Sequence, residues 1–480
     1  MTTESHVQPA SASPPAREIE SARSEASRTR WLLLTVAVGT TLAPLNSTMI
    51  AVALPDIQDA FGVSVTATAW LVTIYLVAMA VGQPIGGRLG DLYGRRRVYL
   101  FGLAWFAIAS AGCAFAPNLL VLIIFRTQQA LAGALSFPNG AAMVREGVPP
   151  ERRGSAFGTI GMAASAAAAS GPPIGGLLVH WFGWQSIFWM NVPVVAIAIG
   201  LGLRSLPRAD AAREETHRAH FDIAGSSLFA ATLAALIVVP TLLKLGQPAL
   251  GVALALGGLG LGAGFVFWEL RSPAPVVDLR LFRTRAFAAA CTSVGISNLV
   301  MYTTLLAIPL YLERVRGHDS RVTGLTLAAL SALSALAGPI GGRWMDARGR
   351  VVPAVVGAVA LFLGMAGLTI AIGGTTLWPV AMALGLMGLG LGVAGASVQA
   401  TAVEAVPVQR AGSASGIYST ARYLGSVIGS TALAIVFVSK PGEGESERFT
   451  ALFAVLVVVA AVGIIANSRI ALSGNPQATS

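Results

Sequence analysis

The stretch PIGGRLGDLYGR, residues 84–95, occurs a second time as PIGGRWMDARGR, residues 339–350, and eight of the twelve positions are identical. A second pair is almost as close. RRGSAFG at 152–158 corresponds to RAGSASG at 410–416, with five of seven positions identical. The two offsets, 255 and 258 residues, are nearly equal. We infer that the chain contains two related halves with the same order of elements.

The composition indicates that these halves lie in a membrane. Hydrophobic residues make up 55% of the 480 and charged residues 11%, with a mean hydropathy of +0.71, whereas soluble domains carry about 25% charged residues. Runs of roughly 20 apolar residues are long enough to cross a bilayer core. We predict an all-α membrane protein with fourteen spans, near 31–54, 68–86, 98–116, 119–143, 154–179, 186–203, 223–243, 249–268, 287–311, 322–341, 352–372, 377–401, 412–437 and 449–467.

Basic residues are distributed asymmetrically between the two sides of these spans. With the N-terminus in the cytoplasm, cytoplasmic segments hold 24 of the 32 basic residues and external segments hold 6. The positive-inside rule therefore predicts that both termini are cytoplasmic. The net charge of +10 mostly reflects the basic residues of these cytoplasmic segments. Because the arginines are scattered over eight segments rather than gathered on one face, we expect no nucleic-acid partner.

The topology explains the repeat. One copy follows the second span and the other follows the tenth, so eight spans separate them and both have the same orientation. We predict two parallel six-helix halves, 31–204 and 286–468, joined by 205–285, a cytoplasmic linker with two inserted helices. Residues 1–30 and 469–480 are predicted to be cytoplasmic tails, the first of them disordered.

Several motifs resemble those of the major facilitator superfamily. GRLGDLYGRR (87–96) resembles its loop signature, RTQQALAG (126–133) its span-4 motif, and GPPIGG (171–176) the span-5 motif of antiporters. WQSIFWMNVPV (184–194) and PVVDLRLFRTRAF (275–287), with the inserted hairpin, resemble the fourteen-span drug:proton antiporter branch.

The resemblance covers nearly the whole chain, and parallel six-span halves are the architecture of the major facilitator fold. It implies a monomeric secondary active transporter of the cytoplasmic (inner) membrane. Such a protein exports lipophilic small molecules, as in multidrug or antibiotic efflux, by alternating access and in exchange for protons.

Charged residues in the two loop copies suggest a latch that closes the cytoplasmic side. Asp91 suits a neighbouring helix N-terminus, where the helix dipole favours negative charge, and Arg95 can pair with Glu146. The alternative is that these are turn and topology residues only. The predicted latch comprises Gly87, Asp91, Gly94, Arg95, Glu146, Asp346, Gly349, Arg350 and Glu404.

Small residues dominate 161–176, GMAASAAAASGPPIGG. They predict a smooth helix face, and Pro172 predicts a bend. We expect the segment with Gly171, Gly175 and Gly176 to form a moving contact between the halves; close packing alone would also explain the small residues.

None of the 22 acidic residues lies in the middle of a predicted span. Related antiporters carry a pattern like LDSTIVNVALP in span 1, whereas this chain has LNSTMIAVALP, so Asn46 stands at the position of the acid. Asparagine cannot titrate, and intramembrane acids are the usual proton relays. Two alternatives follow. The protein is a proton antiporter that uses boundary acids such as Glu146 and Glu404, or it exports a neutral or anionic metabolite without proton antiport.

Two arginines, Arg126 and Arg422, fall inside predicted spans, where a charge is costly and indicates function. We expect Arg126 to face the cavity; bonding to Gln129 within the helix bundle is its structural alternative. For Arg422 we favour a packed helix seam. The substrate and coupling candidates are Asn46, Thr48, Trp70, Tyr75, Arg126, Gln129, Asn139, Asn298, Tyr302, Gln399 and Arg422.

The sequence contains no pattern typical of an enzyme. All five histidines lie in predicted loops or tails, and both cysteines lie in apolar runs. No Walker-type phosphate loop is present. We therefore expect no enzymatic activity, no metal and no cofactor. The expected partners are a lipophilic solute, the bilayer and, in the antiporter alternative, the proton.

Overall fold

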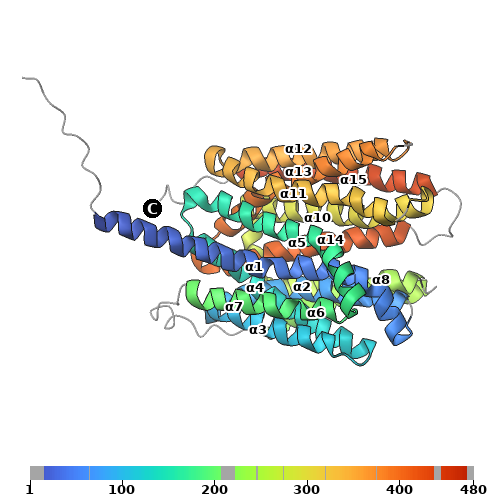
Figure 1. Ribbon diagram of the computed structural model, residues 1–480, viewed down its shortest axis with the longest axis horizontal. Helices are drawn as coiled ribbons and strands as arrows, with labels where there is room; N and C mark the ends of the chain where they lie inside the picture. The colour runs from blue at the N-terminus through green and yellow to red at the C-terminus, as the bar shows by residue number, and fades with distance from the viewer. Residues whose placement is uncertain are drawn as a thin grey trace, which may run out of the picture.

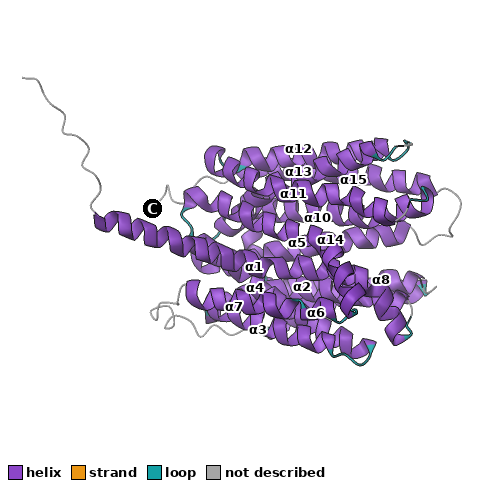
Figure 2. Cartoon of the chain, in the orientation of Figure 1, coloured by secondary structure: helices purple, strands orange, loops and turns teal. Residues whose placement is uncertain are grey.

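The chain folds into helices throughout the residues that the computed structural model describes (Figure 2). These residues are 16–63, 65–206, 222–244, 247–273, 275–318, 320–374, 376–436 and 445–472. Residues 1–15 of the predicted tail 1–30, residues 473–480 of the predicted tail 469–480, and residues 207–221 of the linker lie outside them.

The first half of the repeat forms one helical bundle, consisting of α1 (Ala16–Phe61), α2 (Val65–Tyr93), α3 (Arg95–Ala114), α4 (Leu119–Gly147), the 3₁₀ turn η1 (Pro150–Arg152), α5 (Arg153–Phe182), α6 (Ser186–Trp189) and α7 (Asn191–Ser205). A pair of helices that pack against each other follows, α8 (Ile223–Lys244) and α9 (Pro248–Arg271).

The second half forms a bundle with the same order, consisting of η3 (Leu279–Arg283), α10 (Arg285–Leu310), the π-helical turn η4 (Tyr311–Val315), α11 (Ser320–Arg348), α12 (Val351–Ala371), α13 (Trp378–Glu404), η5 (Val408–Arg410), α14 (Ala411–Val436), α15 (Glu445–Ser468) and η6 (Arg469–Leu472).

The two bundles meet along two helix pairs, α2 with α14 and α5 with α11 (Figure 1). Glycine makes this contact possible because it has no side chain to hold the backbones apart. A Cβ atom added at Gly87 would overlap the Gly412 carbonyl, and one added at Gly154 would overlap the Gly342 carbonyl. Gly87, Gly154, Gly342 and Gly412 of the repeated segments are thus helix-contact residues between the halves.

The outer surface of the bundles is apolar, as a lipid-facing surface requires. Large hydrophobic side chains such as Ile108, Trp181 and Ile370 are exposed, the last of them by 82%. Eleven helices in the described part are long and apolar enough to cross a membrane, or twelve when the two arms of α5 count as one span. Every predicted span coincides with a helix, but α8 and the glycine- and serine-rich α14 are outside that count.

The start of α1 differs from the prediction. We expected residues 1–30 to be disordered, yet α1 begins at Ala16. The segment AREIESARSEASRTR is rich in Ala, Glu and Arg, which are strong helix formers. Adding such residues to a helix that the first span has already nucleated costs little.

The axis of α5 bends by 44° between Pro150–Gly171 and Pro173–Phe182, which places the bend at Pro172. The glycines beside it have different neighbours from those expected. A Cβ added at Gly171 would overlap Thr48, and one at Gly175 would press on Met49, both in α1 of the same half. Gly176 has only a Val52 methyl group near it. The contact of α5 with the other half lies further toward its start, at Gly154 and Gly158. It continues into the first part of 161–176, where the Ser165 hydroxyl lies 3.4 Å from that of Ser334.

Candidate functional site

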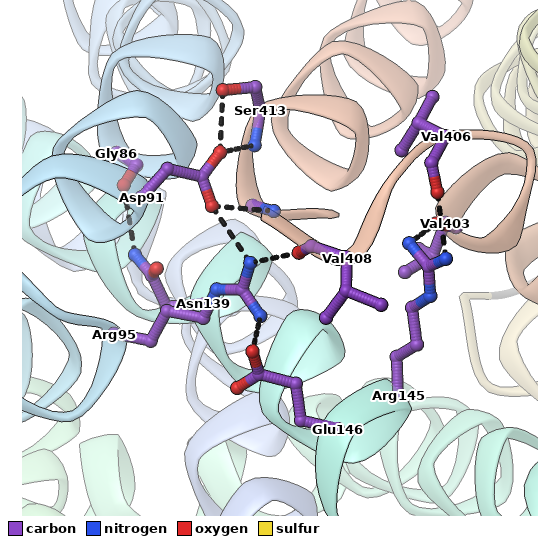
Figure 3. Close-up of polar contacts among 11 residues, drawn as sticks. Gly86, Asp91, Arg95, Asn139, Arg145, Glu146, Val403, Val406, Val408 and Ser413 are labelled. Atoms are coloured by element: carbon purple, nitrogen blue, oxygen red, sulfur yellow. Dashed lines mark hydrogen bonds and ion pairs between the residues drawn. The ribbon is translucent and has the colours of Figure 1, made fainter. Parts of the chain in front are cut away.

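A network of polar contacts ties the two halves together at one end of the bundle (Figure 3). Asp91, in the last turn of α2, accepts hydrogen bonds from the Gly412 and Ser413 backbone N–H groups at 3.0 and 2.8 Å and from the Ser413 hydroxyl at 2.7 Å. These donors form the first turn of α14, where unpaired N–H groups and the helix dipole favour an anion. Asp91 therefore caps a helix of the other half.

Arg95 connects this cap to α4. Its guanidinium lies 3.0 Å from Asp91 and 2.7 Å from the Glu146 carboxylate. It also donates to the Val408 carbonyl of η5 at 2.6 Å. The turn that brings Arg95 into place is made at Gly94, whose φ of 92° is unfavourable for other residues.

The second copy of the motif makes the same arrangement in the opposite direction. Asp346 of α11 accepts from the Gly154 and Ser155 N–H groups at 2.7 and 2.8 Å, and from the Ser155 hydroxyl. Gly349, with φ 78°, makes the corresponding turn. In the same cluster Arg350 pairs with Glu404. Each half thus inserts an acid into the helix N-terminus of the other; we call the two clusters the latch.

One part of the latch has no counterpart across the repeat. Arg145 of α4 donates to the Val403 and Val406 carbonyls at 2.6 and 2.7 Å. It thereby supplies hydrogen-bond donors to carbonyls at the C-terminal end of α13. Arg153 lies 3.4 Å from Glu404 and adds an ion pair across the halves. Sequence reasoning missed Arg145 because its partners are backbone carbonyls, which leave no side-chain pattern. The sequence showed only that Arg145 carries a positive charge.

A second polar cluster lies inside the first half, remote from the latch in sequence. The Gln129 Oε1 atom accepts from Asn46 Nδ2 and Arg126 Nη1, each at 2.7 Å, and Gln129 Nε2 donates to the Ser110 hydroxyl at 2.6 Å. All four side chains are buried. Gln129 therefore joins α1, α3 and α4, and we call this group the Gln129 cluster.

Aromatic rings cover the arginine of this cluster. The Arg126 guanidinium lies 4.4 Å from the Tyr75 ring centroid and 5.8 Å from that of Phe188. Cation–π contacts of this kind compensate part of the cost of a buried charge. We expected Arg126 to face the cavity, but the structure places it at 0% exposure within one half. It is held there because Gln129, one helical turn away, is its hydrogen-bonding partner.

Two further substrate candidates, Asn139 and Thr48, bond within their own half, and two others are partly exposed. Asn139 donates to the Gly86 and Leu135 carbonyls, so it joins α4 to α2 beside the latch and is buried there. Thr48 donates to carbonyls of its own helix and packs on Gly171. Trp70 and Gln399 are half-buried.

The remaining candidates gather around Arg422. Its guanidinium lies 4.3 Å from the ring of Phe137 in α4 and 5.3 Å from the ring of Tyr423. Tyr302 of α10 is within electrostatic reach of both Arg422 and Tyr423. Asn298, one turn earlier, donates to Val294 of its own helix. Arg422 therefore lies at the boundary between the halves, in contact with an aromatic ring from the other half.

The described residues contain no group of three or more His, Cys, Asp or Glu side chains that could hold a metal. The polar contacts have a mechanical consequence, because they hold the two halves together at one end. Contacts at one end of the bundle must break if the halves are to separate there, and most of them pair a charge with backbone groups of the other half.

Comparisons with known proteins agree with this architecture. The family model described as Major Facilitator Superfamily matches residues 36–430. The MFS-type transporter YvkA of Bacillus subtilis is 35% identical over 448 residues, which cover 90% of this chain and 95% of that protein. The multidrug resistance protein Stp of Mycobacterium tuberculosis is 34% identical over 426 residues, 86% of this chain and 76% of Stp.

A third relative, the tetracenomycin C resistance and export protein of Streptomyces glaucescens, is 31% identical over 420 residues, 86% of this chain and 76% of its own length. Among solved structures, the human organic anion transporter MFSD10 superposes with a TM-score of 0.69 at 15% identity, covering 92% of this chain and 99% of that one. At that identity the likeness shows the fold alone.

Proposed function

Because the chain belongs to the Major Facilitator Superfamily, we propose that it is a secondary transporter that exports lipophilic small molecules from the cytoplasm by alternating access. Relatives named for multidrug resistance and for antibiotic resistance and export support the class of solute. The proposal includes fourteen spans, with α8 and α9 as an inserted hairpin between two six-helix halves. It also includes a monomer with both termini in the cytoplasm.

The latch is the observation that carries the mechanism. Asp91 and Asp346 each cap a helix of the opposite half, so the two caps are related by the repeat and close the same end. On the proposed topology that end is cytoplasmic. We infer that the structure has its cytoplasmic side shut, and that opening this side to accept solute breaks both caps together.

The driving force separates two versions of the proposal. Asn46 occupies the position of the usual span-1 acid and is buried in the Gln129 cluster, so the middle of α1 supplies no proton carrier. In the antiport version the carriers are Glu146 and Glu404, since each is a latch carboxylate whose protonation weakens an ion pair with arginine. In the other version, export of neutral or anionic solutes, protons are not exchanged.

Transport by purified protein in liposomes tests the function. We expect accumulation of at least one lipophilic dye from a panel of cationic, neutral and anionic dyes, above that in protein-free liposomes. An imposed pH gradient changes the rate only in the antiport version, and Glu404→Gln and Glu146→Gln then remove that dependence. Failure to move any solute with or without a gradient would reject export as the function.

Thiol labelling tests the topology. Pro117 and Glu151 are exposed residues in loops at opposite ends of α4, and both native cysteines are buried. In intact cells we expect Pro117→Cys to react with a membrane-impermeant maleimide and Glu151→Cys to react only after the membrane is opened. The reverse pattern would show that the arginine distribution was misread.

A further inference from the structure

Arg422 is a charge at the boundary of the two halves with no acid beside it. It lies on α14 of the second half and stacks on Phe137 of the first. None of the ion pairs within the described residues includes it, and its side chain is only partly buried. Its guanidinium has five N–H donors. It shares a side-chain hydrogen bond with Tyr423, and in the described structure none of its donors meets a carboxylate.

Arg126, the other arginine inside a span, is closed to a ligand. It is fully buried within its own half, donates to Gln129 and is covered by the Tyr75 and Phe188 rings. A solute that reached it would have to displace the packing of one bundle. Arg422 needs no such change, because it lies between bundles that alternating access moves apart.

The surroundings of Arg422 are aromatic and come from both halves. Tyr423 adjoins it on α14, and Tyr302 and Tyr418 lie within electrostatic reach of its charge. From the first half come Phe137 and Tyr75, the latter within electrostatic reach of Tyr302 and Tyr423. A ligand held there would contact both halves, which is what a substrate of a rocking transporter must do.

An isolated cation in the interior of a membrane protein is costly, and such residues usually pair or mark a substrate pathway. The described acids cannot serve as partners, because they lie in loops or at helix ends rather than at the depth of Arg422. A ligand that brings its own negative charge would supply the missing partner.

We propose that Arg422 binds the anionic group of an aromatic, lipophilic substrate, whose rings stack on Phe137, Tyr302 and Tyr423. This inference rests on the proposed export function and adds the charge and shape of the solute to it. An arginine suits the role because its planar guanidinium forms bidentate bonds to a carboxylate and stacks on aromatic faces.

Two dyes with the same ring system and opposite charge provide the test. Fluorescein is anionic and rhodamine 123 is cationic, and both are built on a xanthene ring. Binding is measured by fluorescence anisotropy with the full-length protein in phosphatidylcholine nanodiscs. We expect the wild type to bind fluorescein more tightly than rhodamine 123. Arg422→Gln should weaken fluorescein by about tenfold or more, the loss expected for a charged hydrogen bond, and leave rhodamine 123 unchanged or tighter.

Two further variants separate charge from packing. Arg422→Lys should keep the preference for the anion, and Phe137→Leu should weaken both dyes because it removes a ring but no charge. Equal fluorescein affinity in wild type and Arg422→Gln would overturn the proposal. Tighter binding of rhodamine 123 than of fluorescein by the wild type would also overturn it, and that comparison needs no variant to fold.

Dye movement in liposomes distinguishes the two proposals. Export of rhodamine 123 without fluorescein binding would leave the export function standing and remove the anion site. Fluorescein binding that depends on Arg422, without transport of any solute, would keep the site and remove the function.

Discussion

Replacing Asp91 with asparagine is expected to reduce transport by about one to two orders of magnitude. The carboxylate accepts three hydrogen bonds from the start of α14 and contacts Arg95, whereas an asparagine keeps one acceptor oxygen and no charge. Bonds to charged groups contribute about 1.5–3 kcal/mol each, and 1.4 kcal/mol shifts an equilibrium tenfold. The closed state should therefore lose most of its population. Transport is measured as the initial rate at equal protein density.

Asp59→Asn is the matched control, because Asp59 is an exposed acid at the far end of α1. It should transport at the wild-type rate. Spin labels on Tyr93→Cys and Val408→Cys, two exposed positions at the latch with one in each half, report the opening directly. Asp91→Asn should broaden their distance distribution toward longer values. Unchanged transport together with an unchanged distribution would mean that Asp91 is a turn residue without a gating role.

Asp346→Asn tests whether the two copies of the motif are equivalent. Asp346 makes the same set of backbone bonds to Gly154 and Ser155 that Asp91 makes to Gly412 and Ser413. We expect a similar loss of transport. A wild-type rate in Asp346→Asn alongside a defective Asp91→Asn would show that one cap dominates.

The sequence predicted the latch residues because the relevant signal is local and is repeated. Asp91 and Arg95 are four residues apart, which brings them together on any helix or tight turn, and the second copy shows the same spacing. The donors at Gly412 and Ser413 lie in the second repeated pair, 410–416, but the sequence alone did not assign them to Asp91. Arg145 could not be assigned, because the carbonyls it binds at Val403 and Val406 exist at every position of every sequence.

The surroundings of Arg126 and Arg422, the two arginines inside spans, could not be predicted from the sequence. Arg126 follows an apolar run, 119–125, and is followed by three polar residues, 127–129, on successive faces of the helix. The pattern therefore does not reveal which face points into the bundle and which toward a cavity. Gln129 was a visible partner one turn away, but Ser110 and Tyr75 come from other helices. Arg422 was assigned to a packed seam from its small neighbours, whereas its contact with Phe137 depends on how the halves dock.

Two variants within the Gln129 cluster are expected to destabilise the protein to different extents. Gln129→Leu leaves Arg126, Asn46 and Ser110 buried without their shared partner. Leaving a buried polar group unpaired costs about 1–3 kcal/mol, and more when it is charged. We expect a loss of about 3–6 kcal/mol in the free energy of unfolding. Arg126→Leu should cost less, because it removes the charge itself and leaves Gln129 bonded to Asn46 and Ser110.

The double variant Arg126→Leu/Gln129→Leu tests the interaction between these two residues. Adding Arg126→Leu to Gln129→Leu removes the orphaned cation, so the double variant should be more stable than Gln129→Leu alone, as expected for residues that interact directly. Both native cysteines are buried, and their reaction with a fluorogenic maleimide on heating therefore reports unfolding. Gln128→Leu is the control, since Gln128 is half-buried and accepts only a long 3.4 Å bond from Trp105. If Arg126→Leu proved the more destabilising single change, Arg126 would contribute a favourable interaction of its own. The cluster would then be organised around the arginine rather than around the amide that now holds α1, α3 and α4 together.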